Sequence, residues 1–298
     1  MIAVLRDAQR VKSTQFPYGE MQVVAENGYD NKDYLQRKME ALVRWDGDDC
    51  YASGTISEFS EDKRLLHKPF EVSYNKERRI YYLPHSYLMR YTEVQEGRFP
   101  PLTRLRPDEW WYGNTDGEGP TWTRKLDGFV QLPTESLSYC RVTRLAGNQV
   151  ELSRNGGSAF PGRFRMVFDL SQGGNVLHSE SHDYTSGSHD EYDYTWARAE
   201  GGGWYPKTAL VRFYFPADKG FAAGSHYHRY EVLAFNPAVK PARSFFADAM
   251  IHPKPGTVVE NDKTGKKYRL GDKEPEDVVK KLDDLIGTAK SRGFGARP

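Results

Sequence analysis

The strongest constraint in this sequence is a regular alternation of apolar and polar residues between Gly162 and Phe235. In the run GRFRMVFDLS, every second residue from Phe164 to Leu170 is apolar, and three of the four residues alternating with them are charged. A period of two places one face of a β-strand in a core and the other in water. The run KTALVRFYF repeats the pattern, with one side formed by Ala209, Val211, Phe213 and Phe215.

Short turns rich in glycine or proline separate these predicted strands. They are SQGGN, EGGG and PADKGFAAGS, and glycine accepts the positive φ angles of tight turns at little cost. Between the first two turns lie a polar extended run, VLHSESHDY, and a run that alternates Tyr192, Tyr194 and Trp196 with polar residues. Parallel neighbours would need long crossovers, so the segment predicts an antiparallel meander.

Shorter alternating runs outside this segment predict further strands. Apolar residues alternate from Met21 to Ala25 and from Met39 to Trp45. Residues 50–59 and 69–75 continue the series, and Pro84 divides the run 78–94 into two strands. Residues 136–157 predict a hairpin that turns at AGNQ, whereas the proline- and tryptophan-rich stretch 95–127 predicts a long ordered loop or a domain seam.

Both ends of the chain have helical patterns. Residues 1–12 space apolar side chains as in a short amphipathic helix. Near the other end, Pro275 opens a segment with acids early and basic residues late, which suits the helix dipole. Its apolar stripe is Val278, Val279, Leu282, Leu285, Ile286 and Ala289. We therefore predict a mainly β (α+β) fold, with a single antiparallel β domain over 1–272 and a C-terminal helix and tail over 273–298.

The charge balance and the hydropathy exclude several classes of protein. The net charge is +1 and no long basic run is present, which argues against a nucleic-acid partner. No apolar run approaches the ~18 residues that would span a bilayer. The N-terminal MIAVLRDAQR does not have the pattern of a secretion signal.

Histidines are the residues most suggestive of metal chemistry. His178 and His182 lie near several acids, and His226 and His228 share one face of a later predicted strand. Zinc needs three or four convergent donors, and neighbouring strands could supply them. The same run also suits a solvated sheet face, and we expect no metal site and no cofactor. The two cysteines, Cys50 and Cys140, allow either one disulfide or two free thiols.

Catalytic motifs are absent from the sequence. It contains no GxSxG, no HExxH, no P-loop and no GxGxxG after a strand. Carboxylate pairs such as Asp108–Glu109 and Glu191–Asp193 occur, but in a chain with 41 acids such spacing carries little information. We expect no catalytic residue and no enzymatic activity.

The order of the elements and two short motifs resemble the LolA-type lipoprotein-sorting superfamily, in its larger planctomycete-type cell-envelope form. The motifs are GGGWYP at 201–206 and a PGTVV…GKKY element with Pro255, Gly256, Thr257, Val258, Asp262, Gly265 and Tyr268. The resemblance implies a curved, unclosed half-barrel sheet over helices and a periplasmic or cell-envelope location. It also implies a concave apolar face that binds a lipid or lipoprotein acyl chain. The partner expected at the C-terminal helix is an envelope protein.

Seven residues are the candidate ligand-binding set. An apolar ligand favours a cleft because burial contributes ~25 cal/mol per Å². The same side chains are ordinary core if they only pack against the two helices. A carbohydrate-directed β-sandwich with exposed Trp and Tyr, and an envelope sensor or regulatory domain, are the alternative functions. The candidates are Phe164, Met166, Phe168, Trp196, Val211, Phe213 and Phe215.

Overall fold

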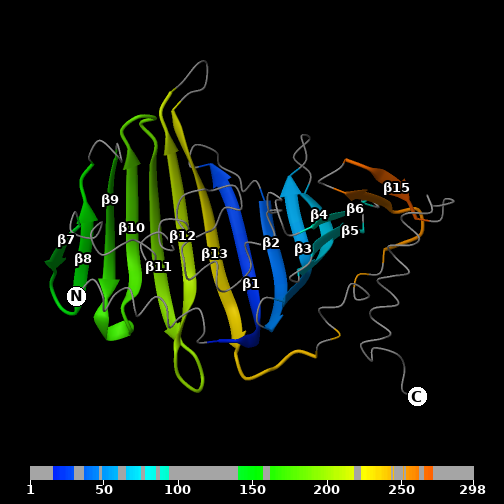
Figure 1. The fold of residues 1–298 in the computed structure, drawn as a ribbon, viewed down its shortest axis with the longest axis horizontal. Helices are drawn as coiled ribbons and strands as arrows, with labels where there is room; N and C mark the ends of the chain where they lie inside the picture. Colours follow the sequence, from blue (N-terminus) through cyan, green and yellow to red (C-terminus); the bar gives the residue numbers. More distant parts are fainter. Residues whose placement is uncertain are drawn as a thin grey trace.

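A single open sheet of 15 strands dominates the computed structural model (Figure 1). Its strand order is β15-β14-β6-β5-β4-β3-β2-β1-β13-β12-β11-β10-β9-β8-β7, and every neighbouring pair is antiparallel except β14 with β6. The structure describes residues 16–29, 37–46, 49–59, 65–74, 78–84, 88–93, 140–156, 162–217, 223–242, 244, 251, 253–261 and 265–270.

Two antiparallel meanders make up most of the sheet. The first runs through β1 (Tyr18–Tyr29), β2 (Arg37–Asp46), β3 (Asp49–Phe59), β4 (Leu65–Tyr74), β5 (Arg78–Leu83) and β6 (Leu88–Glu93). The second runs through β7 (Arg141–Arg144), β8 (Gln149–Arg154), β9 (Gly162–Asp169), β10 (Asn175–Asp183), β11 (His189–Arg198), β12 (Trp204–Phe215) and β13 (Gly224–Asn236). The short hairpin of β14 (Val258–Asn261) and β15 (Lys267–Arg269) extends the β6 edge.

The two meanders meet where the first strand pairs with the last strand of the second meander. β1 pairs with β13 from Glu20 opposite Asn236 to Tyr29 opposite His226, with one irregularity between Gln22 and Val23. Because β1 also pairs with β2 along its length, the N-terminal strand lies inside the sheet and not at an edge. Figure 1 shows this strand in blue between the yellow β13 and β2.

Strand register gives the sheet two faces of different character. Residues paired across antiparallel strands point to the same side. One side, here called the apolar face, carries Val23, Ala41, Ala52 and Val211, which belong to one buried hydrophobic cluster. This cluster extends from β4 to β8. The other side, here called the polar face, carries charged residues over β8–β12 and a small buried cluster of Tyr51, Ile80, Tyr82 and Ile251.

The predicted strands agree with the observed ones, and the antiparallel open sheet is confirmed. One detail of the alternation is wrong. Leu170 does not continue β9 but begins a 3-10 turn (Leu170–Gln172) and is 39% exposed. The carboxylate of Asp169 ends the strand, since it accepts hydrogen bonds from the backbone N–H and the hydroxyl of Ser171 and from the amide of Gln172.

Several sequence predictions fall outside the described residues. These are the helix over 1–12, the loop over 95–127, and the C-terminal helix and tail over 273–298. Within the described ranges, no helix has the length and apolar character needed to cross a bilayer.

Candidate functional site

Six of the seven candidate ligand-binding residues belong to the large hydrophobic cluster or pack against it. Met166, Phe168 and Val211 are buried members of the cluster, and Phe164, Trp196 and Phe213 are partly buried at its margin. The register carries Phe164, Met166 and Phe168 across β10 to the same side as Tyr192, Val211 and Phe213. Phe215, at the end of β12, is 36% exposed. Their role in binding a ligand stays a prediction.

Trp196 is anchored by a hydrogen bond as well as by packing. Its indole N–H donates to the backbone carbonyl of Val176 on β10, at 2.7 Å. Both residues lie at irregularities, between Thr195 and Trp196 on β11 and between Val176 and His178 on β10. These irregularities lie in the pairing of β11 with β12 and of β10 with β9, so the indole joins two strands that are each irregular on their other side.

Sequence reasoning missed a group of aromatic and histidine side chains on the apolar face. The ring of His226 stacks on Phe213 at a centroid distance of 4.7 Å and lies 5.1 Å from His228 and 6.0 Å from Tyr29. The period-two run HYHRYEV contained the signal, because His226 and His228 alternate in phase with the buried Tyr230 and Val232.

The four histidines considered as metal ligands, His178, His182, His226 and His228, do not form one cluster. His228 pairs with Val211 on the apolar face, and His226 pairs with Phe213 there. His182 pairs with His189 on the polar face, and His178 shares that side. The two pairs of histidines therefore lie on opposite sides of the sheet. Among the described residues no three His, Cys, Asp or Glu side chains are grouped to hold a metal ion.

Neither Cys50 nor Cys140 is part of a disulfide, so of the two alternatives that the sequence left open the structure has two thiols. Cys50 is buried in the hydrophobic cluster, and Cys140 is partly buried against it. Burial raises the pKa of the Cys140 thiol, since the thiolate would lose its hydration.

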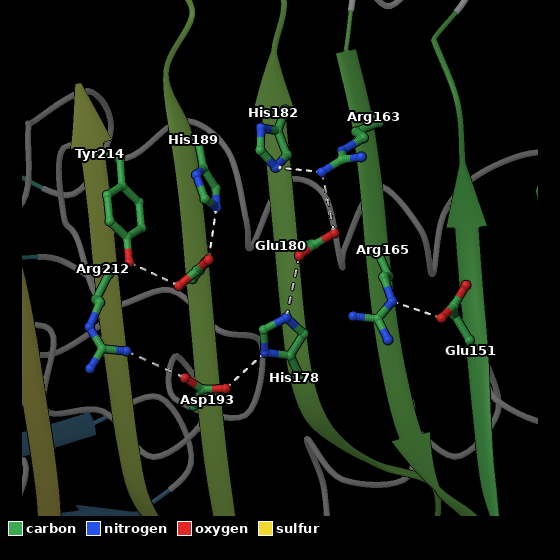
Figure 2. A network of polar contacts seen from close by, with 11 residues as sticks. Glu151, Arg163, Arg165, His178, Glu180, His182, His189, Asp193, Arg212 and Tyr214 are labelled. Carbon is green, nitrogen blue, oxygen red and sulfur yellow. Dashed lines mark hydrogen bonds and ion pairs between the residues drawn. The ribbon is translucent and has the colours of Figure 1, made fainter. Parts of the chain in front are cut away.

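The polar face carries a chain of ion pairs over β8–β12 (Figure 2). Nδ1 of His178 donates to Asp193 at 2.8 Å, and Arg212 lies 3.7 Å from the other oxygen of that carboxylate. Glu180 lies 3.7 Å from the second nitrogen of His178. On the neighbouring strands, Nε of Arg165 donates to Glu151 at 2.7 Å. The predicted pair Glu191–Asp193 is thus divided among other partners, because Glu191 accepts from the hydroxyl of Tyr214.

Three stacked rings cross this polar face at its end nearest the β10–β11 turn. His182 stacks on His189 at 4.0 Å between centroids, and His189 stacks on Tyr214 at 4.5 Å. Nη2 of Arg163 donates to Nε2 of His182 at 3.1 Å, so that nitrogen accepts and carries no proton. Nε2 of His189 lies 3.0 Å from a carboxylate oxygen of Glu191, but it is not aligned for a hydrogen bond, so the two side chains are close without being hydrogen-bonded.

The two polar-face histidines of β10 should titrate on opposite sides of the ordinary pKa of about 6.5. The hydrogen bond to Asp193 raises the pKa of His178, with the charge of Glu180 adding to it. Burial lowers the pKa of His182, and the neighbouring His189 and Arg163 lower it further. Ring-proton NMR titration should therefore give a midpoint above 6.5 for His178 and one below it for His182.

The pKa shifts of His178 and His182 also determine how each residue changes the folding stability with pH. His178 contributes stability below pH ~6.5 that is lost as the pH rises through its raised pKa. His182 contributes stability above pH ~6.5 that is lost as the pH falls through its lowered pKa. In Asp193→Asn the midpoint of His178 should fall back toward 6.5 while that of His182 stays in place. Equal movement of both midpoints would contradict this assignment.

No protein-family model and no curated protein matches this chain. Among solved structures, it is similar to a DUF1329 family protein from Desulfovibrio piger, with 12% identity over 84% of this chain and 99% of that chain and a TM-score of 0.47. It is similar to a LolA superfamily protein from Nitrosomonas europaea, with 9% identity, 84% and 98% coverage and a TM-score of 0.42. It is also similar to LprF from Mycobacterium bovis, with 10% identity, 80% and 96% coverage and a TM-score of 0.27. The LolA superfamily, which the sequence motifs resemble, is thus among the matched structures.

Proposed function

We propose that this protein is a non-catalytic binding protein that holds the acyl chains of a lipid or lipoprotein against the apolar face of its sheet. The observation that carries the proposal is the continuity of that face. One open sheet places buried apolar side chains side by side from β4 through β1 and β13 to β8. A long flexible hydrocarbon chain gains free energy from such a surface in proportion to the area it removes from water.

The margin of the cluster supports the same proposal. Phe164, Tyr205, Phe213 and Phe235 pack against the buried residues but remain partly exposed. The rings of Tyr205 and Phe235 stack at 4.2 Å. Partly exposed aromatic side chains beside a buried apolar cluster provide a contact surface for an apolar ligand that enters from the margin.

The resemblance of the sequence to the LolA-type superfamily supports a periplasmic or cell-envelope location in this proposal. A lipid or lipoprotein acyl chain is then the ligand, and an envelope protein that receives or delivers it is the partner. The C-terminal apolar stripe over 278–289 is the proposed contact for that partner.

The proposal is tested by native mass spectrometry of the delipidated full chain. The probes are palmitoyl-oleoyl phosphatidylglycerol and a dipalmitoylated lipopeptide, each at rising concentration. The wild type should retain at least one of them, and Phe213→Asp should lose it, because a carboxylate at the cluster margin opposes an apolar ligand. Leu233→Asp is the matched control, since Leu233 is 49% exposed and lies outside the cluster. A folded wild type that binds neither probe would refute the proposal, and the apolar face would then be an ordinary hydrophobic core.

A further inference from the structure

Two hydroxyl groups on the apolar face are buried without a hydrogen-bond partner. Ser179 on β10 is 2% exposed and Tyr194 on β11 is 8% exposed, and neither Oγ of Ser179 nor the phenol oxygen of Tyr194 has a partner in the structure. Buried hydroxyls are nearly always hydrogen-bonded, because an unsatisfied one loses its bonds to water and gains nothing in return. Two such groups on one apolar face therefore point to an absent ligand atom.

The register places these two hydroxyl-bearing residues close together. Ser179 pairs directly with Tyr192, and Tyr194 is two residues further along β11 on the same side. Diagonal neighbours of this kind have Cα atoms ~7 Å apart. The row that contains Ser179 continues through Tyr192, Val211 and His228 to Asn27, whose side-chain oxygen is also buried without a partner. Three unpartnered polar groups thus fall within two adjacent rows of one face.

The small side chain of Ala209 lies beside Tyr194 in its row. Ala209 pairs with Tyr194 on one side and with Tyr230 on the other, so two phenol rings flank one methyl group. Tyr194 and Ala209 both belong to the hydrophobic cluster. Tyr194 therefore lies on an inner strand of the sheet and not at its edge, and its phenol oxygen is buried.

The charges of the neighbouring residues indicate which kind of ligand atom would accept hydrogen bonds from Ser179 and Tyr194. Burial raises the pKa of Tyr194, so its phenol keeps its proton and is a hydrogen-bond donor. Among the described strands, these two rows contain no Lys or Arg from β10 to β1; the nearest basic side chains in them are His228 on β13, three strands from Ser179, and Arg37 on β2, which pairs with Asn27. A carboxylate beside Ser179 and Tyr194 would be a buried charge with no Lys or Arg on the described strands next to it, whereas a neutral carbonyl oxygen needs only donors.

We propose that Ser179 and Tyr194 form a polar subsite that donates hydrogen bonds to the carbonyl of an ester- or amide-linked acyl chain. This inference rests on the proposed lipid-binding function and narrows its ligand class. Esterified or amide-linked acyl groups are bound with the carbonyl at the Ser179 row and the hydrocarbon along the apolar face. Free fatty acids and plain hydrocarbons are disfavoured, the first by charge and the second by the unsatisfied hydroxyls.

The test compares three probes of matched chain length, namely methyl palmitate, palmitate and hexadecane. Each is titrated by displacement of a fluorescent acyl probe from the full chain. The wild type should bind methyl palmitate more tightly than the other two. Tyr194→Phe and Ser179→Ala should each lower the affinity for methyl palmitate roughly threefold to tenfold and leave the affinity for hexadecane unchanged. Both substitutions remove an unsatisfied buried hydroxyl, so both variants should fold.

Tyr184→Phe is the control, because it deletes a phenol hydroxyl from a side chain that is 61% exposed and lies outside the cluster. It should keep the wild-type preference for the ester. If Tyr194→Phe and Ser179→Ala also keep that preference, the polar subsite is refuted while acyl binding stands. If the wild type binds palmitate more tightly than the ester, the ligand class is refuted. If none of the three probes displaces the fluorescent acyl probe, or that probe does not bind, the proposed function fails together with the subsite.

Discussion

Phe168→Ala should lower the free energy of unfolding by roughly 3–5 kcal/mol, the range measured for large aromatic side chains removed from a core. Phe168 is fully buried on β9, and it pairs with Val150 on β8 and with Val176 on β10, both buried. Its removal leaves a cavity lined by neighbours that are held in register by backbone hydrogen bonds on both sides, so the site has little freedom to collapse. Urea unfolding followed by circular dichroism measures the loss.

Phe213→Ala is the matched comparison, since it deletes the same ring from the same face. Phe213 is only partly buried, and its ring stacks on His226 at the cluster margin. We expect a smaller loss of stability than for Phe168→Ala, together with weaker binding of the acyl probes. Equal destabilisation by the two substitutions would show that Phe213 is core, and it would remove that residue from the proposed binding surface.

The strands were predictable because the chain alternates in phase with burial over most of its length. In β2, for example, Met39, Ala41, Val43 and Trp45 are all buried, as a period of two requires. The Gly-rich turns also gave the antiparallel order of β9–β13. The pairing of β1 with β13 was not predictable, because it joins segments about 200 residues apart and leaves no local signal.

The sequence does not indicate to which face the histidines of β10 point, because the other face of that strand also carries polar residues. After Leu177 the residues of β10 on the apolar face are Ser179 and Ser181, which are buried although they are polar. An irregularity between Val176 and His178 also shifts the phase of the strand. Without an apolar residue to mark the inner side, period-two reasoning could not separate His178 and His182 from His226 and His228.

The candidate site was predictable to the extent that it follows the apolar alternation. That alternation found six residues of the hydrophobic cluster or its margin, and the seventh, Phe215, lies where β12 ends and is 36% exposed. It missed Ser179 and Tyr194 as a pair. Their significance depends on which hydrogen bonds they lack, and a sequence does not contain that information.

The closest backbone approach at a described glycine lies between β2 and β3. Gly54 pairs with Ala41 on β2 and with Phe70 on β4. A Cβ atom at Gly54 would lie 1.9 Å from the carbonyl oxygen of Glu40 and 2.8 Å from the Cα of Ala41. Both obstacles are backbone atoms of a central strand, so no side-chain rotation relieves the clash.

Gly54→Ala should therefore cost about 3 kcal/mol or more, because β2 and β3 must move apart and weaken the ladder that joins them. Gly28→Ala is the matched control on β1. A Cβ there meets only the ring tip of Tyr227, at 2.9 Å from its hydroxyl oxygen, and a flexible side chain can move aside. We expect its cost to stay within about 1 kcal/mol. Urea unfolding of both variants decides the matter, and a Gly54→Ala protein as stable as Gly28→Ala would show that the two strands are not packed this closely.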